Sequence, residues 1–137
     1  MVPHAVVHRA DFTDTLAFTI VGKNKKMFYC PDIDAWDGLS DSLPAVAGEH
    51  ELLLLDSTFY DNNELPGRDM TLIPHPRVAQ TVDLLTSSGV LKSTEHLCEV
   101  FLIHINHSNR LWVDRELVQN LASQGIKVGR KGMKWEI

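Results

Sequence analysis

"ELLLLDSTF", residues 51–59, is the stretch of the sequence that decides the fold. Its leucines, Leu52–Leu55, form a continuous apolar run of strand length that stops at Asp56. A strand exposed on one face alternates apolar and polar residues, whereas a parallel strand covered on both faces does not. The run therefore predicts a strand buried on both faces, with a carboxylate at its end.

The residues before this strand predict an antiparallel ribbon. "HAVVH" (4–8), "TDTLAFTIVG" (13–22) and "KMFYC" (26–30) have the alternation and β-branched content of strands. Gly22–Lys26 is typical of a polar hairpin turn. Residues 32–50 combine turn formers with a weak helical pattern that Pro44 is expected to interrupt.

The residues after it predict alternating helices and strands. Apolar residues recur at helical spacing in 77–88, a strand follows at 100–104, and Asp114 caps a helix over 115–124. Residues 126–137 are expected to form two short strands around a glycine turn. Such alternation implies right-handed crossovers, so the predicted fold is a mixed α/β sheet with helices on one face.

The composition is that of a single ordinary domain. The chain has 137 residues, 44% of them hydrophobic, so residues 1–137 are predicted to form one domain. The net charge is -5 and no basic block exceeds Lys25–Lys26, which argues against nucleic acid as a main partner. No apolar stretch approaches the roughly 20 residues of a membrane span. Cys30 and Cys98 lie far apart in apolar runs, as expected of reduced thiols in a cytoplasmic protein.

Four apolar runs end on ionisable side chains: His8, Asp32, Asp56 and His104. In α/β sheets, ligands bind in the crevice beyond the strand ends. Each residue has a structural alternative, because a single histidine is often only hydrogen-bonded and Asp32 or Asp34 could cap a short helix. Burying four such groups is costly unless they are paired or bind a metal, so together they favour a site. Imidazole and carboxylate suit zinc, with iron and manganese as alternatives.

Six short motifs follow one another along the chain: "HRADFTDTLAFTI", "YCPDIDAWD", "LLDSTFYDNNELPGRDM", "IPHP", "LIHINHSN" and "GIKVGRKGMKWEI". In this order they resemble the carboxyl-terminal half of metallo-β-lactamase-fold proteins. The likeness is strongest to relatives of the pyrroloquinoline-quinone (PQQ) biosynthesis B protein, and it covers nearly the whole chain. The resemblance implies half of an αβ/βα sandwich with a metal site at its edge.

The resemblance also implies roles for individual residues. His8, Asp32 and His104 match metal ligands, with Asp32 in the bridging position, although this sequence has "PDI" where "GDT" is more usual. His75 matches a catalytic histidine that contacts the substrate or leaving group. Asp56 matches a residue that supports the ligands. The loop that carries Asn106 follows the His104 strand, and Asn106 is assigned the same supporting role.

The principal signature of these proteins, H-x-H-x-D-H, is absent from the sequence. It lies in the amino-terminal half and would supply four of the ligands. The chain is therefore expected to bind a divalent metal weakly or not at all by itself, and to be inactive alone. Completed by an amino-terminal half, it would be a metal-dependent hydrolase of esters or phosphodiesters. A truncated gene, an expressed fragment and a chain that pairs with a separate amino-terminal half are all open interpretations.

The missing half also has a consequence for assembly. In a complete sandwich the second face of this sheet would be covered, and alone it would leave a large apolar patch bare. A second copy of the chain is the simplest cover, so we expect a homodimer or a larger assembly. Two alternatives stay open: a non-catalytic dimeric α/β module of the same ancestry, and a small-molecule-binding domain that uses the His75 loop without metal.

Overall fold

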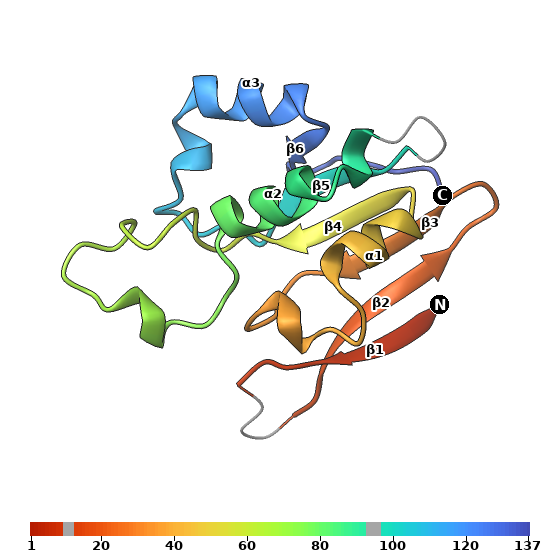
Figure 1. Ribbon diagram of the computed structural model, residues 1–137, viewed down its shortest axis with the longest axis horizontal. Helices are drawn as coiled ribbons and strands as arrows, with labels where there is room; N and C mark the ends of the chain where they lie inside the picture. The colour runs from red at the N-terminus through yellow and green to blue at the C-terminus, as the bar shows by residue number, and fades with distance from the viewer. Residues whose placement is uncertain (10–12, 93–96) are drawn as a thin grey trace.

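The computed structural model describes residues 1–9, 13–92 and 97–137, and in these ranges six strands form one mixed sheet (Figure 1). The strands lie in the order of the sequence: β1 (Val2–Val6), β2 (Thr15–Val21), β3 (Lys26–Cys30), β4 (Leu52–Asp56), β5 (Glu99–Ile103) and β6 (Ile126–Val128). The helices are α1 (Leu43–Gly48), α2 (Val78–Ser87) and α3 (Arg115–Ser123). Short 3-10 turns are η1 (Trp36–Gly38), η2 (Met70–Leu72), η3 (Val90–Lys92) and η4 (Arg110–Trp112).

The sheet changes from antiparallel to parallel at β3. The strands β1, β2 and β3 pair antiparallel, and the turn between β2 and β3 closes where Gly22 N donates to Lys25 O at 3.0 Å. From β3 to β6 all pairs are parallel, and each crossover carries one of the three α-helices. The predicted ribbon, hairpin and crossover helices are confirmed.

The helices cover one face of the sheet and form the main core with it. Residues of all three helices pack with alternate residues of the strands: Leu43, Val78, Leu85 and Leu121 join Leu53, Leu55, Val100 and Leu102. The helix over 77–88 was predicted from this apolar spacing, and Val78 and Leu85 are fully buried. No helix in the described ranges is long and apolar enough to cross a membrane.

β4 is the central strand, as the leucine run predicts. All five of its residues are buried, and it pairs with β3 on one side and β5 on the other. Leu53 and Leu55 point into the helix-covered core, whereas Leu52 and Leu54 belong to a second cluster with Phe101 on the opposite face. This position explains why the apolar run has no polar alternation.

The carboxyl-terminal segment covers part of the second face. Trp135 and Ile137 pack against the cluster of Leu52, Leu54 and Phe101, and the rings of Trp135 and Phe101 meet edge to face at 5.2 Å. Lys23 N donates to Ile137 O at 3.2 Å, and a Cβ at Gly22 would lie 2.1 Å from the carbonyl carbon of Ile137. The chain end therefore approaches the hairpin so closely that only glycine fits there.

Three features of the predicted elements are wrong. β1 ends at Val6, so His8 lies in the loop beyond it. Pro44 does not interrupt a helix, because it occupies the first turn of α1, where its missing N–H costs nothing. After β6 the chain forms no second strand: it turns at Gly132 (φ 89°), and Trp135 packs on the face of the sheet against Phe101.

The two cysteines are free and buried in the core. Burial, followed by the nearby carboxylates, raises the pKa of each thiol to about 12. Both thiols therefore stay protonated and inert, as the spacing of the cysteines predicts.

Truncating the central strand tests this arrangement. Leu53→Ala leaves a cavity between β4 and the helices, and we expect the free energy of unfolding to fall by about 2–5 kcal/mol in a urea titration. The control is Leu72→Ala, because the Leu72 side chain is 77% exposed. We expect the control to change the free energy by no more than about 0.5 kcal/mol. Equal losses in the two variants would contradict the central placement of β4.

Candidate metal centre

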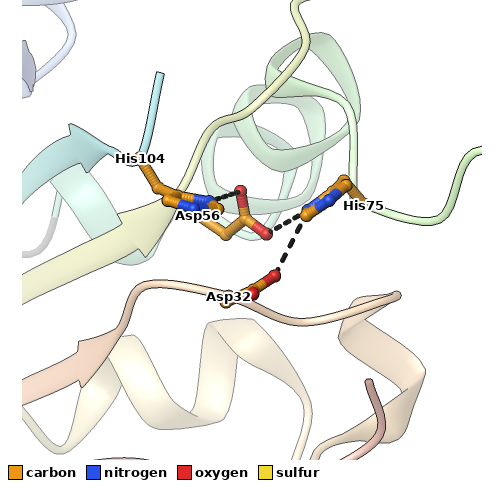
Figure 2. Close-up of side chains that lie close together, drawn as sticks. All are labelled: Asp32, Asp56, His75 and His104. Carbon is orange, nitrogen blue, oxygen red and sulfur yellow. Dashed lines mark hydrogen bonds and ion pairs between the residues drawn. The ribbon is translucent and has the colours of Figure 1, made fainter. Parts of the chain in front are cut away.

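The site lies where the parallel strands end. Asp56 is the last residue of β4, Asp32 stands two residues after β3, and His104 follows β5 directly. Because parallel neighbours end at the same edge of a sheet, these three side chains meet although the sequence separates them. His75 joins them from the long loop between β4 and α2 (Figure 2).

Asp56 is the buried anchor of the site. Its Oδ2 accepts from Ile33 N at 3.1 Å and lies 2.8 Å from His75 Nδ1. Its Oδ1 accepts from the backbone N–H and the hydroxyl of Thr58 at 3.0 and 2.7 Å. Burial by itself would raise the pKa of this carboxyl group, but the hydrogen bonds from His75 and Thr58 hold the pKa below its ordinary value. Asp56 is thus a buried anion.

His75 and His104 have unusual backbone conformations. They are the two non-glycine residues in the described ranges with positive φ, at 155° and 55°. The left-handed conformation of His104 costs about 1–2 kcal/mol for a residue with a Cβ. Such strain persists only where the surrounding structure imposes it, and it concentrates at functional sites. At His104 it turns the imidazole from the strand direction back toward Asp56.

Thr58 links the two imidazoles. Its hydroxyl lies 3.2 Å from His75 Nδ1 and 3.0 Å from His104 Nδ1, while it donates to Asp56. Thr58 is not among the site residues predicted from the sequence. The available signal was the D-x-T spacing after β4, because an aspartate at a turn commonly accepts from the residue two positions on.

Asp32 carries the observation that points to a cation. Among the buried side-chain oxygen and nitrogen atoms of the described residues, Asp32 Oδ1 alone has no hydrogen-bond partner. His75 Nδ1 lies 3.5 Å from this oxygen, at ion-pair distance but without a hydrogen bond. Buried carboxylate oxygens are almost always hydrogen-bonded, so an oxygen without a hydrogen bond among other ligand-type side chains fits a site for a cation.

The four side chains form one donor set. Asp32, Asp56, His75 and His104 each offer an atom, and these atoms lie within 4.8 Å of one another (Figure 2). Two carboxylates and two imidazoles are a ligand set that suits zinc, iron or manganese. The set runs from the fully buried Asp56 to His104, whose side chain is 46% exposed, so the site opens to solvent on the His104 side. The residues present therefore fit a divalent metal ion.

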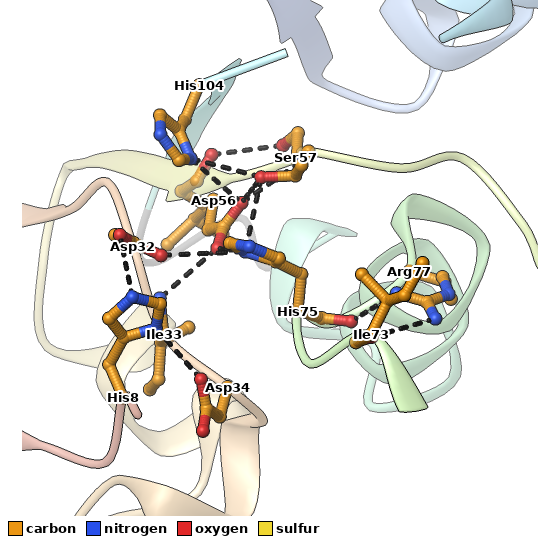
Figure 3. A network of polar contacts seen from close by, with 12 residues as sticks. His8, Asp32, Ile33, Asp34, Asp56, Ser57, Ile73, His75, Arg77 and His104 are labelled. Carbon is orange, nitrogen blue, oxygen red and sulfur yellow. Dashed lines mark hydrogen bonds and ion pairs between the residues drawn. The ribbon is translucent and has the colours of Figure 1, made fainter. Parts of the chain in front are cut away.

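His8 stands beside this set. Its Nε2 is 3.2 Å from Asp32 Oδ2 and its Nδ1 is 2.8 Å from Asp34 Oδ1, while the His8 and His75 ring centres are 5.8 Å apart (Figure 3). Asp34 thus orients His8 against Asp32. The alternative interpretation of Asp32 and Asp34 as helix caps does not hold, since the residue before η1 is Ala35 and makes no side-chain cap.

Asn106 lies behind the site and does not contact its donor atoms directly. Its backbone N–H donates to Thr58 O at 3.1 Å, and its side-chain amide donates to Ser108 Oγ at 2.6 Å. The carbonyl oxygen of Asn106 accepts from Trp112 Nε1 at 2.9 Å. Asn106 therefore ties the His104 loop to the Thr58 turn.

Arg77 fixes the loop that carries His75. Its guanidinium donates to His75 O at 2.7 Å and to Ile73 O at 3.1 Å, and its Nε donates to Asn62 Oδ1 at 2.8 Å (Figure 3). Burial lowers the pKa of Arg77. Arg77 thus holds the loop through the carbonyl oxygens of Ile73 and His75, and the His75 ring lies against Asp56.

Comparison with known proteins defines the fold. No protein-family model and no curated protein matches the chain. Among solved structures, the Zn(2+)-bound PqqB from Methylobacterium extorquens matches at a TM-score of 0.68 and 15% sequence identity, over 91% of this chain. The chain has a metallo-β-lactamase-like half fold. It spans 42% of the length of that PqqB chain, and the fold implied by the six motifs is confirmed.

Removing the Asp56 charge tests the anchor. We expect Asp56→Asn to lower the free energy of unfolding of the metal-free protein by about 1.5–3 kcal/mol, because it removes the charge that strengthens hydrogen bonds from three segments. Chemical denaturation in EDTA gives the value. The matched control is Asp83→Asn, an exposed position on α2, which should be nearly neutral. A neutral Asp56→Asn variant would show that the anchor does not hold the site together.

Proposed function

We propose that this protein binds a divalent metal ion, zinc in the first instance, through Asp32, Asp56, His75 and His104. The observation that carries the proposal is the buried, unpartnered Asp32 Oδ1 within the four-residue donor set. The likeness to a structure described as Zn(2+)-bound supports the choice of metal. Iron and manganese suit the same donors.

We further propose that the ion serves hydrolysis of an ester or phosphodiester once an amino-terminal half completes the site. A divalent ion there would act as a Lewis acid and lower the pKa of bound water. His8, held between Asp32 and Asp34, would serve as a ligand in a completed two-metal centre, with Asp32 between the ions. The chain alone is proposed to be inactive, because it lacks H-x-H-x-D-H.

A second role for His75 is favoured by its contact with Asp56. The 2.8 Å approach of its Nδ1 to a buried carboxylate is the geometry that fixes the tautomer of a catalytic imidazole. In that arrangement His8, Asp32 and His104 hold the metal, Asp56 orients His75, and the other ring nitrogen of His75 exchanges a proton with the substrate or leaving group. The two roles differ in whether the loss of His75 removes the metal.

Metal titration tests the proposal. We expect metal-depleted protein to bind one Zn²⁺ per chain in isothermal calorimetry, weakly because the H-x-H-x-D-H ligands are absent, with His104→Ala and Asp32→Asn each weakening binding further by more than about tenfold. His75→Ala should weaken it equally if His75 is a ligand and leave it unchanged if His75 is an acid or base.

The matched control is His107→Ala, because His107 is an exposed imidazole three residues from His104 and outside the donor set. It should bind zinc like the wild type. Absence of zinc binding at neutral pH, or equal losses in His104→Ala and His107→Ala, would overturn the site. Tight binding without hydrolysis after addition of an amino-terminal half would favour the non-catalytic module instead.

We also propose that the second face of the sheet is an assembly surface. Alternation along β2 and β3 places five apolar or aromatic side chains opposite the helices, each partly exposed: Leu16, Phe18, Ile20, Met27 and Tyr29. The carboxyl-terminal segment packs against the neighbouring Leu52 cluster. A second copy of the chain is the cover we favour, with an amino-terminal half as the competing one.

Sedimentation velocity at micromolar concentration tests the assembly. We expect a particle of twice the 15.4 kDa of one chain, and a shift to monomer in Leu16→Glu, because a charge on the apolar face must be desolvated on pairing. Val113→Glu is the control, since Val113 is 81% exposed and lies outside β2 and β3. A wild-type monomer would contradict the proposed homodimer.

A further inference from the structure

A second cavity lies away from the metal centre, on the helix-covered side of the antiparallel ribbon. It has a volume of about 210 Å³ and is lined by residues of β1, β2, β3 and the α1 region, none of which belongs to the metal donor set. An apolar cavity of about 150 Å³ is enough to hold benzene. The volume therefore suits a molecule with one aromatic ring.

A chain of three polar side chains enters this cavity. His4 Nε2 lies 2.8 Å from Thr19 Oγ1, which lies 3.0 Å from His50 Nε2. His50 Nδ1 in turn lies 2.7 Å from Val46 O in α1. Thr19 and His50 are both 4% exposed, so they are the fixed inner end of the chain.

The directions of these hydrogen bonds follow from the carbonyl at the inner end. Val46 O can only accept, so His50 Nδ1 carries a proton. Burial, and then the nearby Lys26, lower the pKa of His50, which leaves the ring neutral and its Nε2 an acceptor. The Thr19 hydroxyl must then donate its single proton to His50 Nε2.

The same reasoning reaches the outer end of the chain. Because Thr19 Oγ1 has given its proton to His50, it accepts from His4 Nε2. A neutral His4 ring with its proton on Nε2 has its lone pair on Nδ1. The network thus fixes Nδ1 as the acceptor nitrogen of His4, which lines the cavity.

The walls of the cavity are apolar and aromatic. Phe28 is flanked by the rings of His4 and His50 at 5.8 and 5.6 Å, and Leu39 and Val46 line the same space. The rim has two acidic side chains, Asp41 and Glu49, and one basic side chain, Lys26. Lys26 Nζ lies 3.5 Å from a carboxylate oxygen of Glu49. An anionic ligand would meet this net negative rim, so the cavity disfavours carboxylates and phosphates.

We propose that this cavity is a binding site for a small neutral aromatic molecule with one hydrogen-bond donor, such as a phenol, whose O–H donates to His4 Nδ1. The ring packs on Phe28, Leu39 and Val46, and the donor recognises the imidazole nitrogen that the Thr19–His50 network fixes as an acceptor. The site is independent of the metal proposal, since it shares no residue with the metal centre.

Ligand titration by NMR in the presence of EDTA tests this site. The probes are phenol and anisole, which share a ring and an oxygen, but only phenol has a donor. We expect saturable shifts of the Leu39 and Val46 methyl groups, with phenol bound about fivefold more tightly than anisole, as one neutral hydrogen bond provides. In His4→Phe, which keeps a ring and removes the acceptor, phenol and anisole should bind equally.

A second variant separates recognition from occupancy. Ala45 is an exposed lining residue of α1, so Ala45→Leu fills the cavity without disturbing the core, and both ligands should bind more weakly. The matched control is Ala79→Leu on α2, outside the cavity, which should bind both as the wild type does. Three outcomes would each overturn the proposal. The wild type could bind phenol and anisole equally, the preference for phenol could persist in His4→Phe, or Ala45→Leu could leave binding unchanged.

Discussion

The buried carboxylate of Asp56 is the constraint on which the site depends. It has no exposed surface, yet it is held as an anion by hydrogen bonds from three directions. Ile33 N fixes the loop after β3, Thr58 fixes the turn after β4, and His75 brings in the long loop before α2. A buried charge is tolerated only when it is paired in this way, so the anchor and the site form together.

The parallel half of the sheet explains why the donors meet. β3, β4 and β5 run side by side in one direction, and Asp32, Asp56 and His104 come from their ends. The core beneath them is rigid because the whole of β4 is buried. The backbone strain at His104 and the buried Asp32 oxygen without a hydrogen bond occur together at this edge of the sheet.

The two faces of the sheet serve different purposes. Helices cover the first face, which contains the main core and the cavity beside His4. The second face is covered over β4 and β5 by Trp135 and Ile137, while the apolar residues of β2 and β3 on this face are only partly covered. Exposed apolar surface of this kind is typical of an interaction site, and the chain spans 42% of the length of the PqqB chain that it matches in fold.

The sequence by itself determined the order of the elements up to β6 and the ionisable residues at the ends of β4 and β5. The leucine run identified β4, helical spacing identified α2 and α3, and the six motifs gave the half fold, because periodicity and motif order are local properties of the chain. It could not decide that His8 lies against Asp32 and Asp34 rather than in the donor set, or that Asp56 and His75 lie within that set. The D-x-T spacing marks Thr58 as a turn residue, but it does not place the Thr58 hydroxyl between the two imidazoles, and no local pattern brings His4, Thr19 and His50 into one hydrogen-bonded row. Those arrangements depend on which loops the parallel crossovers bring together, and only the tertiary structure decides that.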